Sequence, residues 1–211
     1  MSKKVYILLS QTTTFVARSI RRISGCKYNH AAISFDTDLS EMYAFARKQH
    51  HACLSAGLVR ESRIRYLEKN CELPICVYEL EVTDDQYRWI KLVIEYMMGN
   101  REYKYNLLSM LSFPFFRGIK TYKAFTCSEF VAFILRRLGY LKLKESYQYT
   151  PEDIGKELKD YLWYEGDMRD LVKEMDTDET YYSHYSRQWL YLDVTSLMRL
   201  FERAFMRVKM Y

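Results

Sequence analysis

A cysteine at the predicted start of a buried helix is the residue of this sequence best placed for nucleophilic chemistry. Cys127 directly follows Thr126, and Thr126 with Glu129 forms a capping box, the pair of side chains that marks a helix N-terminus. Cys127 therefore falls in the first helical turn, where free backbone N–H groups and the helix dipole favour an anion such as a thiolate. Apolar residues then recur at helical spacing and predict one buried face before Gly139 ends the helix: Phe130, Val131, Ile134, Leu135 and Leu138.

A thiol nucleophile needs a base, and the sequence offers four histidines. His50 and His51 lie in a predicted loop, and His184 lies in an aromatic C-terminal segment. His30 stands at the first position of a predicted strand, where a base facing a helix N-terminus could reach a thiol at ~3 Å. Two structural interpretations stay open beside this one. Cys127 could simply fill space in the core, and His30 could be satisfied by the backbone at the strand entrance.

The composition of the chain limits the classes of protein to which it can belong. The chain has 211 residues, 49% of them hydrophobic, with 7 Gly and 3 Pro, which indicates a folded domain rather than a disordered or collagen-like chain. A net charge of +5 is too small and too dispersed for a typical nucleic-acid binder. Tyrosine is unusually frequent, at 20 residues, and predicts many half-buried aromatic positions. No run approaches the ~20 apolar residues of a membrane span.

The cysteines predict neither a disulfide framework nor a metal site. The five are irregularly spaced without a CxxC pair: Cys26, Cys53, Cys71, Cys76 and Cys127. His50, His51 and Cys53 superficially resemble metal ligands, but no second ligand cluster accompanies them. The apolar run after Lys4 is also too short for a signal peptide. These features predict a reducing, cytoplasmic location and no metal or organic cofactor.

Short strands and capped helices are expected to position the cysteine and the histidine. Strands are predicted over residues 4–10, 31–36, 42–46 and 76–82, the middle two joined as a hairpin by residues 37–41. Besides the helix of Cys127, capping signals predict helices after Gln11, after Thr83 and, with proline in the first turn, after Thr150. A last helix is predicted over residues 194–208. Docking on the core is one role for it, and contact with a membrane surface or a partner is another.

The order of these motifs resembles the papain-like NlpC superfamily. The strand His30–Phe35, the helix start Phe125–Val131 and the later Thr150–Pro151 are similar to motifs of its circularly permuted branch, which includes YiiX-like proteins and the lecithin retinol acyltransferase group. In ordinary members the cysteine helix precedes the histidine strand, whereas here the histidine comes first. The resemblance covers roughly residues 4 to 158 and implies an α+β fold, with an antiparallel sheet packed against the helix that carries the cysteine at its N-terminus.

The resemblance also implies roles for individual residues. Cys127 is the expected nucleophile and His30 the expected general base, with an oxyanion held partly by the backbone N–H of Cys127. Tyr103 occupies the place of the family's site tyrosine, although a half-buried core position explains it equally well in so tyrosine-rich a chain. The glycine pair expected after that tyrosine is missing, and Lys104, Tyr105 and Asn106 stand there instead.

The residue that should orient the histidine is not evident. The family position falls near Ala44, whose side chain cannot form a hydrogen bond, and Tyr43 points to the opposite face. Glu41 lies near the turn, several residues from His30 at ~3.3 Å each. A group from elsewhere in the chain, a backbone carbonyl or a water molecule remain as alternatives.

The sequence thus predicts a cysteine-dependent hydrolase or acyltransferase acting on an amide or ester bond. Residues 1–160 form the predicted catalytic domain and residues 161–211 an aromatic-rich extension with a terminal helix, expected to dock on the same core. The expected substrate is a small molecule, a peptide or an acyl or lipid-like compound, the last favoured by an apolar group of Phe113, Phe115, Phe116 and Phe125. No nucleic-acid partner is expected. Peripheral membrane contact and the oligomeric state stay open, and the rival function is a papain-like binding or scaffold module without turnover.

Overall fold

The computed structural model describes most of the chain. The described residues are 2–12, 25–50, 55–67, 72–116 (113–116 by backbone only), 118–172, 178–182, 191, 194–195 and 197–203. The helix predicted after Gln11 lies almost wholly outside them. So do His51, Cys53, Cys71 and His184, and the side chains of Phe113, Phe115 and Phe116.

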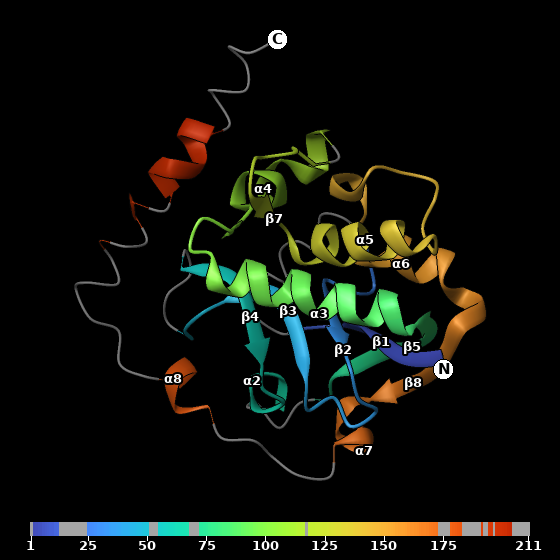
Figure 1. The fold of residues 1–211 in the computed structure, drawn as a ribbon. Helices are drawn as coiled ribbons and strands as arrows, with labels where there is room; N and C mark the ends of the chain where they lie inside the picture. The colour runs from blue at the N-terminus through green and yellow to red at the C-terminus, as the bar shows by residue number, and fades with distance from the viewer. Residues whose placement is uncertain are drawn as a thin grey trace.

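A six-stranded antiparallel sheet forms the centre of the molecule, with the strand order β4-β3-β2-β1-β5-β8 (Figure 1). The four predicted strands are confirmed, and β4 and β8 are strands that the sequence did not reveal. The bounds are β1 (Ser2–Ser10), β2 (His30–Ser34), β3 (Met42–Arg47), β4 (Ala56–Glu61), β5 (Pro74–Thr83) and β8 (Leu162–Asp167).

The central strands are buried on both faces. In β1, Val5, Ile7 and Leu9 belong to the core on one side of the sheet, and Tyr6 and Leu8 belong to the core on the other. Successive side chains of a strand point to opposite faces, so a strand covered on both sides is a continuous apolar run. This explains why the β1 sequence shows no polar alternation.

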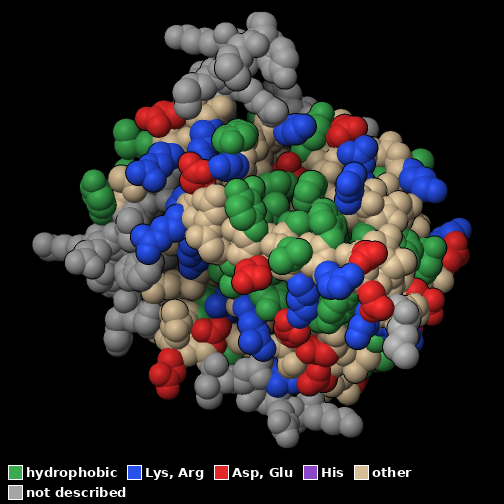
Figure 2. Space-filling model, in the orientation of Figure 1, with side chains coloured by type: hydrophobic (Ala, Val, Ile, Leu, Met, Phe, Trp, Pro, Cys, Tyr) green, Lys and Arg blue, Asp and Glu red, His purple; other side chains and the backbone are tan. Residues whose placement is uncertain are grey.

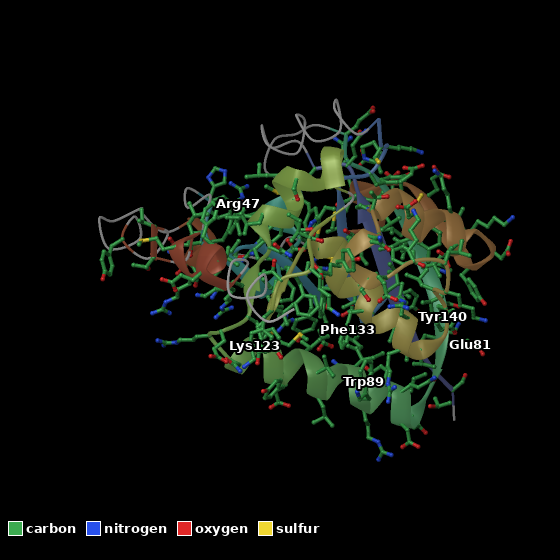
Figure 3. The ribbon with its side chains drawn as sticks, turned by 90° about the horizontal axis from the view of Figure 1, so that it is seen from above. Arg47, Glu81, Trp89, Lys123, Phe133 and Tyr140 are labelled. Carbon is green, nitrogen blue, oxygen red and sulfur yellow. The ribbon has the colours of Figure 1, made fainter. Side chains whose placement is uncertain are left out.

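Helices cover both sides of the sheet. Two long ones, α3 and α5, lie side by side over the same face, as Figures 1 and 3 show from two directions. The helices are α2 (Ile64–Leu67), α3 (Asp84–Gly99), α4 (Leu107–Phe116), α5 (Cys127–Leu138), α6 (Pro151–Glu157), α7 (Met168–Leu171) and α8 (Glu179–Tyr182), with short 3₁₀ turns η1 (Ser146–Gln148) and η2 (Lys159–Tyr161).

Aromatic side chains join α3 and α5 to each other and to the sheet. Trp89 of α3 and Phe133 of α5 lie between the two helices with ring centroids 6.2 Å apart (Figure 3). Deeper in the core, Phe130 of α5 and Phe45 of β3 are fully buried, with centroids 5.4 Å apart. This contact anchors the helix that begins at Cys127.

The other face of the sheet is covered by α2, by α7 and by the end of β8. Met168 is completely buried there with Met42 and Ala44, and Tyr66 of α2 packs against the same cluster. Because β8 and α7 lie beyond residue 160, the first part of the C-terminal extension belongs to the main sheet.

A small parallel pair lies beside the N-terminus of α5. Its strands are β6 (Lys104–Tyr105) and β7 (Ala124–Phe125), and Tyr105 pairs with Phe125. Residues 197–203 are helical and place Leu200, 2% exposed, against Leu107 and Ala124. Of the predicted terminal helix, 194–195 and 197–203 are helical, and residues 204–208 lie outside the described part. The fold is α+β.

Candidate active site

The N-terminus of α5 presents Cys127 as the sequence predicts. Thr126 is the N-cap in extended conformation, and its hydroxyl accepts a hydrogen bond from the Glu129 N–H at 3.1 Å. The Glu129 carboxylate in turn accepts the Thr126 N–H at 3.3 Å, which completes the capping box. Cys127 is therefore the first helical residue, and its side chain is 6% exposed.

His30 lies at the start of β2, and its imidazole interacts with the Cys127 thiol. β2 runs between β1 and β3, with His30 paired to Ser10, and α5 packs on β2. The charge of Cys127 and a side-chain hydrogen bond to it both act on the pKa of His30. The two residues that the sequence singled out, 97 positions apart, are thus brought together.

Glu61 is the third member of the cluster, and sequence reasoning did not identify it. The carboxylate lies at the end of β4, and its Oε2 is 2.9 Å from His30 Nε2. The side chains are only 12% exposed for His30 and 6% for Glu61. Because Glu61 occupies Nε2, Nδ1 is the ring nitrogen left for the thiol. Glu41 instead bonds to Lys91 and to the Tyr43 hydroxyl, and Ala44 is buried in the opposite core.

Tyr66 supports the carboxylate from α2. Its hydroxyl donates a hydrogen bond to the same Glu61 Oε2 that binds His30, and its ring centroid lies 6.0 Å from that of the imidazole. Burial and the charge of Glu61 raise the pKa of Tyr66 well above its usual range, so the hydroxyl keeps its proton and stays a donor. The result is a chain of contacts from Tyr66 through Glu61 and His30 to Cys127.

These contacts favour a thiolate–imidazolium pair. Burial by itself raises the pKa of Cys127, but the charge of His30 and its hydrogen bond lower it, and the backbone of Ala31 and Ser128 lowers it further, so that the pKa falls below that of an ordinary thiol. Burial lowers the pKa of His30, yet the charges of Glu61 and Cys127 outweigh it and raise the pKa well above 6.5. Burial likewise raises the pKa of Glu61, but His30 brings it below its usual value.

The tyrosine that interacts with the thiol is Tyr105 rather than Tyr103, and the Tyr105 hydroxyl also donates a hydrogen bond to Met110 Sδ at 3.7 Å. Burial, then the charge of Cys127 and a side-chain hydrogen bond to it, raise the pKa of Tyr105 well above its usual range. Tyr103 instead stacks on Phe125 at 6.2 Å between centroids and meets Tyr96 edge-on at 6.0 Å. The role that the sequence assigned to Tyr103 stays a prediction, and Tyr105 is the tyrosine beside the sulfur.

The other described residues that the sequence singled out do not bind to Cys127, His30 or Glu61. His50 packs against the rings of Tyr181 and Tyr182. In the part of the chain that the structure describes, no group of three or more His, Cys, Asp or Glu side chains is placed to hold a metal ion. Of the apolar residues proposed for an acyl pocket, Phe125 is half-buried and stacks with Phe45 at 5.4 Å.

Comparison of the chain with protein-family models, with curated proteins and with solved structures found no match. The geometry of the site therefore carries the functional argument. Among the described residues, no helix has both the length and the apolar character needed to cross a membrane.

Proposed function

We propose that this chain is a thiol hydrolase or acyltransferase of the permuted papain-like type, with Cys127, His30 and Glu61 as its reacting triad. The observation that carries the proposal is the placement of His30, which interacts with Cys127 of the helix packed on its strand and binds Glu61 at 2.9 Å. A nucleophile, a base and a group that orients the base are the three parts that acyl transfer through a thiol requires. The antiparallel sheet, the cysteine at a helix N-terminus and the histidine-first order support the family.

The reaction follows from these contacts. The Cys127 thiolate attacks an amide or ester carbonyl, and the C=O electrons move to oxygen to give a tetrahedral intermediate. This intermediate collapses as His30 gives its proton to the leaving amine or alcohol, which leaves a thioester on Cys127. His30 then takes a proton from water or from an acceptor, and attack on the thioester releases the acyl group and restores the thiolate. Glu61 stabilises the imidazolium each time it forms in the cycle.

The oxyanion would be held by hydrogen-bond donors beside the sulfur. The backbone N–H of Cys127, in the first turn of α5, is one proposed donor. The Tyr105 hydroxyl, which donates to Met110 Sδ at 3.7 Å, is a second proposed donor once a substrate is bound. The substrate class supported by these groups is an amide or an ester, with no metal in the mechanism proposed.

The pH dependence of alkylation tests this proposal. Iodoacetamide labelling of Cys127, followed by peptide mass spectrometry, is expected to reach half its maximal rate below the ordinary thiol pKa of about 8.5. The direction follows from the lowered pKa of Cys127. In the variant His30→Ala the midpoint should move upward, because the positive partner is lost. The midpoint reports the pKa even where access to a thiol that is 6% exposed slows the absolute rate.

Two other thiols of the same chain serve as internal controls. Cys26 is partly exposed, and Cys76 is buried with a pKa that burial raises. A Cys127 midpoint at or above that of Cys76, unchanged by His30→Ala, would contradict the enzyme. It would favour the rival function, a binding or scaffold module, for which the low exposure of the sulfur is the supporting observation.

A further inference from the structure

A group of five cations, the basic cluster, surrounds the backbone just before β6. Lys48 reaches it from the end of β3, across Gly57 of β4. A Cβ added to Gly57 would lie 3.2 Å from Lys48 Cε and 3.3 Å from the Tyr103 carbonyl oxygen, so the missing side chain lets both come close. The members of the cluster are Lys48, Arg101, Lys104, Arg199 and Arg203.

The helical segment 197–203 contributes two arginines to the basic cluster, Arg199 and Arg203. Arg203 Nη1 donates a hydrogen bond to the Glu102 carbonyl oxygen at 2.8 Å, so its guanidinium lies against the turn that leads into β6. Arg199 precedes it by one helical turn and therefore shares its side of the helix. Burial of Leu200 against Leu107 and Ala124 fixes this segment in place.

The positive charges of the basic cluster lower the pKa of both of its lysines, Lys104 and Lys48. Burial lowers the pKa of Lys104, and the charges of Lys48, Arg199, Arg203 and Arg101 lower it further. Burial and then the charge of Arg101 lower the pKa of Lys48. The five positive charges therefore lie close enough to repel one another.

Within the described ranges no carboxylate forms an ion pair with any of the five. The neighbouring Glu102 carboxylate is paired with Lys123. Figure 3 shows Arg47 and Lys123 at the end of the molecule where the helical segment 197–203 lies, and the left of Figure 2 shows several Lys and Arg side chains in blue with Asp and Glu side chains in red among them.

We propose that the basic cluster is a binding site for a phosphate-type anion. Among the described residues the one carboxylate beside the cluster, Glu102, acts on Arg203 but is already paired with Lys123, so the positive charges exceed the negative ones. Holding like charges together costs stability, and a bound dianion with several acceptor oxygens removes that cost. The planar fork of arginine matches phosphate oxygens in pairs, and lysine adds a point charge. Three arginines and two lysines suit a phosphate ester better than a single carboxylate.

Thermal unfolding in matched salt tests the anion site. Inorganic phosphate at about ten times its Kd is expected to raise the Tm of the wild-type chain by about 3–6 °C over sodium chloride of the same ionic strength. Lys104→Gln should weaken phosphate binding about tenfold or more, because a charged hydrogen-bond donor is lost, and Lys104→Arg should retain it. Without phosphate at low salt, Lys104→Gln should unfold at a higher temperature than the wild type, because one like charge is removed.

Lys159→Gln is the matched control, since Lys159 is an exposed lysine on η2, away from the basic cluster. It should respond to phosphate as the wild type does. Equal phosphate shifts in Lys104→Gln and Lys159→Gln, or a wild-type shift that chloride reproduces, would overturn the anion site. Phosphatidylcholine vesicles with and without phosphatidylserine distinguish the source of the anion. Lys104-dependent binding to the anionic vesicles alone would assign the site to a lipid headgroup, and response to inorganic phosphate assigns it to a free phosphate group.

Discussion

Replacing Glu61 by glutamine is expected to lower the steady-state hydrolysis of p-nitrophenyl acetate at pH 7 by about 10²–10⁴-fold, because the acid–base group His30 loses the carboxylate that orients it and stabilises its imidazolium. Glutamine keeps the size of the side chain but loses the charge that raises the pKa of His30. The imidazolium is then less stable, and the ring is free to turn away from the thiol. The rate of deacylation should fall most, because in this step His30 must take a proton from the attacking water.

Glu79→Gln is the control for this experiment. Glu79 is also a strand carboxylate with a basic partner, Lys4 at 2.7 Å, but it lies at the surface of β5. Its substitution should leave the rate near that of the wild type. A Glu61→Gln enzyme as fast as Glu79→Gln would show that His30 needs no carboxylate, and the triad would have to be abandoned.

Stability gives a second readout of the Glu61 substitution, best made in the Cys127→Ala background so that the thiol plays no part. A raised His30 pKa stabilises the fold fully below about pH 6.5, and this stabilisation is lost as the pH rises through the folded pKa. A lowered Glu61 pKa stabilises the fold above about pH 4.5, and this stabilisation is lost as the pH falls through the folded pKa. The loss of unfolding free energy caused by Glu61→Gln should therefore be greatest between these two values. A pH-independent loss would contradict the ion pair.

Replacing Tyr105 by phenylalanine should lower the same rate by about 10²-fold, the effect of removing one oxyanion donor. The pKa of Tyr105 lies well above its usual range, so the hydroxyl carries its proton at neutral pH and can donate. The change removes one oxygen from a residue that contacts the sulfur and keeps the ring in place, so the fold should be retained. Circular dichroism and the alkylation midpoint of Cys127 would check this.

Tyr103→Phe is a control two residues away. Its ring stacks on Phe125, a contact that phenylalanine preserves, so the rate should stay close to that of the wild type. The opposite result, loss of rate in Tyr103→Phe and not in Tyr105→Phe, would restore Tyr103 as the site tyrosine that the family resemblance implies.

Local signals in the sequence predicted the helix that carries the nucleophile, because caps act over three or four residues. Thr126 and Glu129, Thr83 and Gln86, and Thr150 and Asp153 all form the reciprocal hydrogen bonds expected of them. The pairing of Cys127 with His30 was proposed from the place of His30 at the entrance of a predicted strand and from the order of the motifs.

The roles of Glu61 and Tyr105 were not predicted from the sequence. They depend on contacts between segments that lie far apart in the chain, and the spacing of residues does not encode such contacts. Glu61 ends a strand, Ala56–Glu61, whose sequence has neither alternation nor a β-branched run, and it reaches His30 across the sheet. The choice between Tyr103 and Tyr105 depends on the parallel pairing of Tyr105 with Phe125, two residues before Cys127. A one-residue change in that register would present a different side chain to the sulfur.

The pairing of β8 with β5 has a consequence for how this protein can be shortened. Five positions of β5 are matched in register by residues 162–167, and Lys27 forms an ion pair with Glu165 of that strand. A chain that stopped at residue 160 would leave the outer backbone groups of β5 without partners, as an open template for another chain. It would also uncover the pocket that Met168 fills against Met42. The shortest version of the chain that keeps β5 paired on both sides and Met42 covered must therefore extend through α7.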